Sequence, residues 1–136
     1  MIRTRLNDRA RPDNVLFVED DYVILMHLSQ ALRGDGFGVI EASNMAEART
    51  ALHSWSPIDV AVLDILLPRR EDGLGLVKWI RANRPDVEVV IATGVGVDEE
   101  LRSLGPVISK PYEPEQLIKA VREALTKRLE PVARHG

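Results

Sequence analysis

The stretch Ile58-Asp59-Val60-Ala61-Val62-Leu63-Asp64 decides the fold class of this chain. No polar residue interrupts the run from Val60 to Leu63. A strand with one face in water alternates polar and apolar residues, whereas a parallel strand covered by helices on both faces is apolar throughout. The stretch therefore predicts a buried parallel strand, and Asp64 is the polar residue at its carboxyl end.

Four other mainly apolar segments are also predicted to be strands, and patterns of helical period separate them. Strands are predicted at Asn14–Val18, Phe37–Glu41, Val87–Ala92 and Pro106–Ser109. A capping box, Ser43-Asn44 with Glu47, marks the start of one predicted helix, which ends by Ser56. A loop is predicted from Pro68 to Gly73, and a helix follows it from about Leu74 to Ala82. The other predicted helices are Tyr22–Gly34, Asp98–Ser103 and Pro114 through Leu125. Strands that alternate with helices favour an α/β fold, a doubly wound five-stranded parallel sheet with helices on both faces.

Composition restricts the classes of function. The 136 residues include no cysteine, which excludes a disulfide framework, a thiolate metal site and a cysteine nucleophile. A net charge of −3 and an aromatic content of 4% argue against nucleic acid as a partner. No apolar run approaches the roughly 18 residues that span a bilayer, and no signal-peptide pattern follows the N-terminal arginines. We expect a cytoplasmic protein that binds neither nucleic acid nor membrane.

The chain length fits one domain with two short extensions. The predicted strands and helices occupy residues 14–128. Residues 1–13 are expected to form a flexible N-terminal arm, and residues 129–136 a C-terminal tail.

Polar side chains collect at the carboxyl ends of the predicted strands. They are Glu19, Asp20 and Asp21 after the first strand, Asp64 after the third, Thr93 after the fourth and Lys110 after the fifth. Ligands of open α/β sheets bind at this edge. Converging carboxylates repel one another without a cation, and Mg²⁺ prefers oxygen ligands and phosphate. Carboxylates, a hydroxyl and an ammonium group together suit phosphoryl chemistry.

Four motifs in register resemble the receiver domain of two-component response regulators. They are Val15-Leu16-Phe17-Val18-Glu19-Asp20-Asp21, Asp59-Val60-Ala61-Val62-Leu63-Asp64-Ile65-Leu66-Leu67-Pro68 with Asp72-Gly73, Ala92-Thr93-Gly94, and Ser109-Lys110-Pro111-Tyr112. The resemblance covers Val15 to about Arg128 and implies a flavodoxin-like strand order, 2-1-3-4-5. It further implies a stand-alone, single-domain response regulator in a phosphorelay, similar to a subgroup with a Thr-Gly turn and a reduced fourth helix.

The resemblance also implies a role for each residue that matches a motif. Asp64 corresponds to the aspartate that accepts a phosphoryl group from a histidine kinase or a histidine phosphotransfer protein. Glu19 and Asp20 correspond to the acidic pair, with Asp20 as a direct Mg²⁺ ligand and Glu19 acting through water. Asp64 itself and the backbone carbonyl of Leu66 would complete the metal site, which could also take Mn²⁺. Such a domain is a signalling protein rather than an enzyme, with self-catalysed phosphotransfer and autodephosphorylation.

The remaining matches and departures concern the response to phosphorylation. Thr93 corresponds to the switch hydroxyl, and Lys110 to the lysine that pairs with the phosphoryl group. The usual switch aromatic, three positions before the lysine, is Val107 in this chain. Leu66 follows the acceptor by two residues and cannot position water by hydrogen bonding, so we expect a persistent phosphoryl group.

Two alternatives remain open at this point. One is a receiver-like interaction module that signals without phosphorylation, and the other is a receiver fragment of a larger regulator or hybrid kinase. A downstream protein partner is possible under each alternative. We expect the chain to be a monomer or a weak homodimer.

Overall fold

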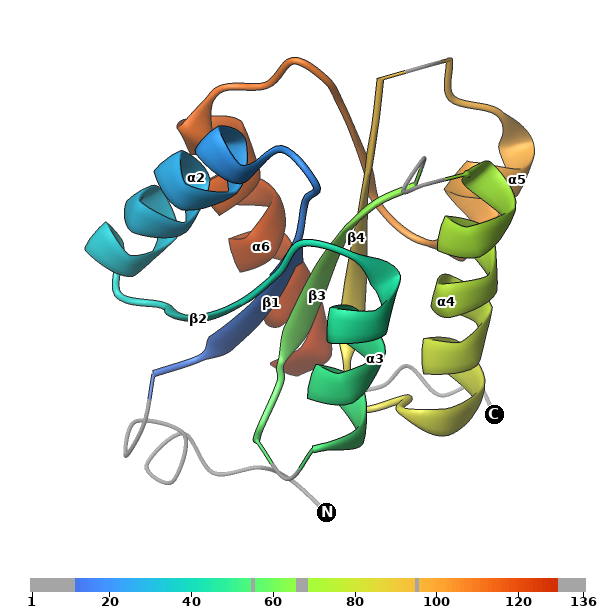
Figure 1. Cartoon of the computed structure of the whole chain (residues 1–136), viewed down its shortest axis with the longest axis horizontal. Coiled ribbons are helices and arrows are strands. Elements are labelled where there is room, and N and C mark those ends of the chain that lie inside the picture. Colours follow the sequence, from blue (N-terminus) through green and yellow to red (C-terminus); the bar gives the residue numbers. More distant parts are fainter. Residues whose placement is uncertain (1–11, 55, 66–68, 95, 130–136) are drawn as a thin grey trace.

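The sheet has the predicted architecture. A computed structural model describes residues 12–54, 56–65, 69–94 and 96–129 of the chain (Figure 1). The described strands are β1 (Asn14–Val18), β2 (Gly38–Ala42), β3 (Val60–Asp64), β4 (Glu88–Thr93) and β5 (Val107–Ser109). They form one parallel sheet in the order β2-β1-β3-β4-β5. This confirms the α/β class and the flavodoxin-like order.

Helices cover both faces of this sheet. They are α2 (Tyr22–Gly34), α3 (Met45–His53), α4 (Arg70–Asn83), α5 (Glu99–Leu104) and α6 (Pro114–Leu129). Helices α2 and α6 lie on one face, and α3, α4 and α5 lie on the other (Figure 1). In β3, Val60 and Val62 pack toward α2 and α6, whereas Ala61 and Leu63 pack toward the opposite layer. Alternate residues thus enter two different cores, which is why no polar residue interrupts β3 before its last residue, Asp64.

Local hydrogen bonds explain where two of the helices begin. Asn44 accepts a hydrogen bond from the backbone N–H of Glu47 at 2.8 Å, and the Glu47 carboxylate accepts one from the N–H of Ser43 at 2.6 Å. These bonds satisfy backbone donors beside the N-cap residue Asn44 and confirm the capping interaction predicted for Ser43, Asn44 and Glu47, with the Glu47 carboxylate on the N–H of Ser43 rather than on that of Asn44. At the start of α2, the Asp21 carboxylate accepts hydrogen bonds from the N–H groups of Val23 and Ile24.

Helix α4 corrects the sequence prediction. It begins at Arg70, whereas a loop was predicted as far as Gly73 and a helix only from about Leu74. Gly73 lies within the first turns of α4 and packs against the backbone of Ile65, the residue directly after β3, where an added Cβ would lie 2.4 Å from the carbonyl oxygen. The glycine therefore serves a close helix-to-strand contact rather than a loop, and this contact could not be read from the local pattern.

The predicted arm and tail lie almost entirely outside the described residues, so the limits of the domain stay a prediction. Among the residues that the structure describes, no helix is long and apolar enough to cross a membrane.

Candidate acidic site at the carboxyl ends of the strands

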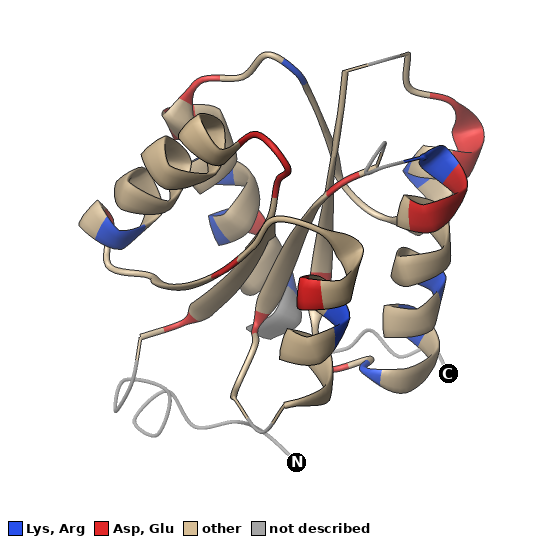
Figure 2. Ribbon diagram, in the orientation of Figure 1, with Lys and Arg blue, Asp and Glu red and all other residues tan. Residues whose placement is uncertain are grey.

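Parallel pairing brings the predicted site residues to one edge of the sheet. Glu19 follows β1, Asp64 is the last residue of β3, and Thr93 is the last residue of β4. Lys110 follows β5, and its backbone N–H donates a 2.7 Å hydrogen bond to the carbonyl of Thr93. Figure 2 shows acidic residues at the end of β3 and in the loop that follows β1. Since parallel strands end at the same edge, residues distant in the sequence meet there.

Three carboxylates form the centre of this site. Glu19, Asp20 and Asp64 each offer an oxygen atom, and these atoms all lie within 4.8 Å of one another. Glu19 and Asp64 are buried, with 1% and 8% of their surfaces exposed, whereas Asp20 is exposed. The cluster is therefore covered on the sheet side and open to solvent on the side of Asp20.

Lys110 joins the two buried carboxylates. Its Nζ donates hydrogen bonds to Glu19 Oε1 at 2.8 Å and to Asp64 Oδ2 at 2.7 Å. One ammonium thus contacts two buried anions, and such an arrangement compensates part of the cost of removing them from water.

Burial and ion pairing shift two pKa values in this cluster. Burial raises the pKa of the Glu19 carboxyl, although the hydrogen bond from Lys110 opposes that rise. Burial would lower the pKa of the Lys110 ammonium, but the hydrogen bonds to Asp64 and Glu19 outweigh it, and the pKa lies above its usual range. Lys110 is therefore a cation at neutral pH, which is the state that attracts a phosphoryl group.

Thr93 and Leu66 complete the set of predicted site residues. Thr93 is fully buried at the end of β4, one residue beyond the Ala92 that pairs with Asp64. Leu66, expected to supply a carbonyl ligand, lies outside the described residues.

Val107 occupies the position at which the resemblance predicts an aromatic switch residue. It pairs with Ile91 of β4 and packs, partly buried, against the core beneath α3, α4 and α5.

Two nearby residues have structural roles that the sequence did not predict. Asp21 directs its carboxylate to the first turn of α2, so it is a helix cap, which its place before a helical pattern could have indicated. Tyr112 has a buried hydroxyl, and both burial and the charge of Glu19 raise the pKa of this phenol. Its only sequence signal was an aromatic residue two positions after Lys110.

Comparison with known proteins agrees with this geometry. The family model described as the response regulator receiver domain matches residues 15–122. This chain belongs to the response regulator receiver domain family.

Curated relatives of this receiver domain include regulators with further sequence. The probable transcriptional regulator ycf27 of Guillardia theta is 31% identical over 125 residues, which cover 88% of this chain and 48% of the relative. The transcriptional regulatory protein AruR of Pseudomonas aeruginosa is 32% identical over 128 residues, which cover 87% of this chain and 51% of the relative. The chain thus spans about half the length of these relatives.

Two solved structures share the fold over nearly their whole length. A response regulator receiver protein from Sinorhizobium medicae has a TM-score of 0.77 at 28% identity, with 88% of this chain and 98% of that chain covered. A response regulator from Thermotoga maritima has a TM-score of 0.73 at 28% identity, with 85% and 98% covered.

The carboxylates of this receiver domain fit a hard divalent cation. All three groups that converge offer oxygen atoms, which are the donors that Mg²⁺ prefers, and exposed Asp20 leaves one side of the cluster open for water ligands.

Proposed function

We propose that this receiver domain accepts a phosphoryl group on Asp64 from a histidine kinase or a histidine phosphotransfer protein, with Mg²⁺ bound beside it. The observation that carries the proposal is the contact of the Lys110 ammonium with both Glu19 and Asp64, next to the oxygen of Asp20. A cation and a cluster of oxygen donors around one carboxylate suit phosphoryl transfer, in which negative charge on phosphoryl oxygens must be stabilised.

Glu19, Asp20, Asp64 and the backbone carbonyl of Leu66 would hold the metal ion, Mg²⁺ or Mn²⁺. When bound, the ion would neutralise charge on the non-bridging oxygens of the phosphoryl group. The exposed position of Asp20 supports this proposal, because a second protein must reach the site with its phosphohistidine.

The proposed transfer forms one bond and breaks one bond. A carboxylate oxygen of Asp64 attacks the phosphorus atom of the phosphohistidine, an O–P bond forms, the P–N bond breaks, and its electron pair returns to the imidazole nitrogen. Lys110 contacts Asp64 at 2.7 Å and would pair with the transferred group, and the hydroxyl of Thr93 would donate a hydrogen bond to it.

Hydrolysis would end the signal. Water would attack the same phosphorus atom, release phosphate and restore the Asp64 carboxylate. Leu66 has no polar side-chain group to orient that water, so we expect the phosphoryl group to persist.

The test is phosphorylation by a small-molecule phosphodonor. The full chain is incubated with acetyl phosphate and Mg²⁺, and intact mass spectrometry is expected to show one added phosphoryl group. Asp64→Asn should remove the adduct, whereas Asp72→Asn, which changes a carboxylate outside the cluster, should keep it. An adduct that survives Asp64→Asn unchanged would refute the assignment.

Val107 favours a second candidate function, an interaction module that signals without phosphorylation. It occupies the position where the family usually has an aromatic switch residue, so phosphorylation cannot be coupled to rotation of an aromatic side chain at this position. Titration with Mg²⁺, followed by NMR, separates the two candidates, because a module that has lost phosphotransfer is expected to leave the amides around Asp20 and Asp64 unchanged.

The setting of this domain is also part of the proposal. A cytoplasmic location, a downstream protein partner and a monomeric or weakly dimeric state fit a stand-alone response regulator. The half-length match to the curated relatives fits equally well a receiver segment of a larger regulator or hybrid kinase.

A further inference from the structure

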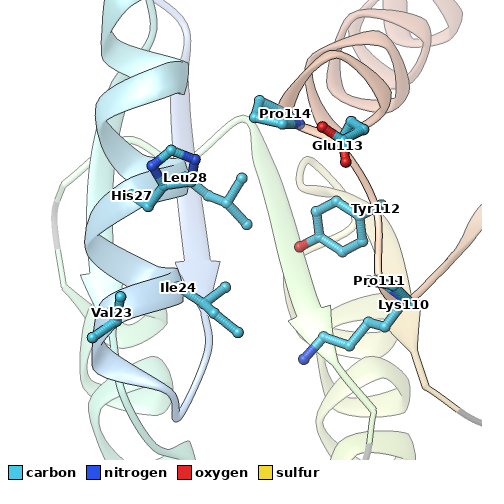
Figure 3. A pocket seen from close by; sticks show the side chains of 9 residues that line it. All are labelled: Val23, Ile24, His27, Leu28, Lys110, Pro111, Tyr112, Glu113 and Pro114. Atoms are coloured by element: carbon cyan, nitrogen blue, oxygen red, sulfur yellow. The ribbon is translucent and has the colours of Figure 1, made fainter.

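The acidic site has two flanks of different character. On one flank, the start of α2 and the segment that joins β5 to α6 form a mainly apolar groove, which Val23, Ile24 and Pro111 help to line (Figure 3). On the other flank lie α4, which follows β3 and Asp64, and α5, which follows β4 and Thr93. Side-chain ion pairs join α4 to the start of α5. These pairs therefore link the two segments that lead away from Asp64 and Thr93.

Arg70, the first residue of α4, makes the closest of these contacts. Its Nη2 donates a 2.6 Å hydrogen bond to Oδ2 of Asp98, the cap of α5, and lies 3.5 Å from Oε1 of Glu100. Lys78, about two turns further along α4, lies 3.9 Å from the other carboxylate oxygen of Glu100. The Arg70 side chain is 29% exposed, so water and salt screen its pairs less than those of a fully exposed arginine.

Helix α5 depends on such tertiary contacts. It has six residues, fewer than the roughly 12–15 that an isolated helix needs in water. Leu101 is its buried residue, and Leu104 packs partly buried against the same core. Oδ1 of Asp98 accepts a 3.0 Å hydrogen bond from the N–H of Leu101, while Oδ2 pairs with Arg70. One carboxylate thus caps α5 and ties it to α4, so loss of the Arg70 contact should loosen both.

A phosphoryl group on Asp64 would need room at this edge of the sheet. Asp64 and Thr93 are both buried, with 8% and 0% of their surfaces exposed. The group adds a phosphorus atom and three oxygens beside Asp64, and packed interiors leave little free space, so we expect the end of β4 to shift. Four residues, 94–97, separate Thr93 from Asp98. A shift at Thr93 therefore pulls on the cap of α5, and the contact with Arg70 resists it.

We propose that Arg70 is a positioning residue that holds α5 against α4, and that release of this contact favours a phosphoryl group on Asp64. The coupling to Asp64 rests on the proposed function, whereas the hold on α5 does not. Because coupling between two sites is reciprocal, a phosphoryl group on Asp64 loosens α5 by the factor by which release of α5 favours that group. Loss of a merely structural residue would instead weaken the site or leave it unchanged.

The first experiment measures the hold on α5 by amide hydrogen exchange of the full chain, free of Mg²⁺ and phosphodonor. The reporters are the N–H groups of Leu101 and Arg102, which both donate to Asp98. Arg70→Gln should speed their exchange about three- to fivefold, as expected for partly exposed ion pairs, and should leave the amides of α6 unchanged. Arg69→Gln is the matched control, because this neighbouring arginine pairs within α4. Equal exchange in the two variants would overturn the proposal.

The second experiment measures how tightly the site captures a mimic of the phosphoryl group. Each full-length protein is titrated with beryllium fluoride, which forms a tetrahedral adduct with a carboxylate, in the presence of Mg²⁺ and is followed by NMR. Arg70→Gln should bind the mimic more tightly, by at most the same factor of about three to five. Arg69→Gln should bind like the wild type, and Arg70→Lys, which keeps the charge, should lie close to it. In the wild type, the bound mimic should speed exchange at Leu101.

The outcomes separate this inference from the proposed function. If the wild type binds no beryllium fluoride, the proposed function fails and the coupling fails with it, whereas the exchange result still decides the hold on α5. If the wild type binds it, and Arg70→Gln binds it no more tightly than Arg69→Gln does, the coupling is refuted and Arg70 is a structural residue alone.

Discussion

Replacement of Lys110 by methionine tests the electrostatics of the acidic site directly. Methionine keeps a long, flexible apolar side chain but removes the ammonium that contacts Glu19 and Asp64. Both carboxylates are then left buried without this cation. We expect the variant to fold with a clearly lower free energy of unfolding at neutral pH.

The magnitude follows from geometry and burial. The oxygens of Glu19 and Asp64 lie within 4.8 Å, and two unit charges at that separation repel by about 3.5 kcal/mol at an effective dielectric constant of about 20. Removal of one partner from a buried ion pair costs about 3–5 kcal/mol, and the 23% exposure of the Lys110 side chain favours the lower end. We therefore expect a loss of about 3 kcal/mol, within a typical total stability of about 5–15 kcal/mol.

The loss should depend on pH in a defined direction. The pKa of Glu19 is raised in the folded protein, so the folded state binds that proton more tightly than the unfolded chain does. The penalty for burying the charged carboxylate is therefore present above the raised pKa and disappears as the pH falls toward the ordinary value of 4.5. Lys110 remains charged across this window, because its pKa is raised. Without Lys110 the pKa of Glu19 rises further, so acidification should narrow the difference between variant and wild type.

Urea unfolding of the variant and the wild type at about pH 7.5 and about pH 4.5 measures both the loss of unfolding free energy and its dependence on pH. Lys78→Met is the matched control, because Lys78 is exposed and lies 3.9 Å from Glu100, and its loss should cost less than about 1 kcal/mol. A loss for Lys110→Met below about 1 kcal/mol, or one that is equal at both pH values, would contradict the reasoning.

Three further outcomes are expected. Gly73→Ala should destabilise the protein by more than about 2 kcal/mol, because the new Cβ meets the Ile65 carbonyl. Gly75→Ala in the same helix has open space around the new Cβ and should raise the free energy of unfolding by up to about 1 kcal/mol. Urea unfolding of both variants checks these values. Asp98→Ala removes the side-chain cap of α5 and should cost about 1 kcal/mol, with faster amide hydrogen exchange confined to that helix. Asp20→Asn should weaken Mg²⁺ binding at least about tenfold in an NMR titration without loss of stability, since Asp20 is exposed; unchanged affinity would remove it from the metal site.

The fold was predictable because its signals are local or follow general rules. The apolar run from Val60 to Leu63 requires cover on both faces, which the two helical layers provide. The capping box at Asn44 and Glu47 depends on residues within one turn, so its sequence spacing was sufficient. The convergence of Glu19, Asp64 and Lys110 follows from parallel pairing, because every strand contributes its carboxyl end to the same edge.

What the sequence by itself determined is therefore the class of fold, the sheet edge that carries the site, and most of the polar groups there. Only the tertiary structure decided that Lys110 contacts Glu19 and Asp64 together, that α4 begins at Arg70, and that this arginine pairs with the cap of α5. The physical reason is the range of each interaction. Caps and apolar runs act between near neighbours, whereas an ion pair or a helix-to-strand contact depends on atoms that only the packed chain brings together.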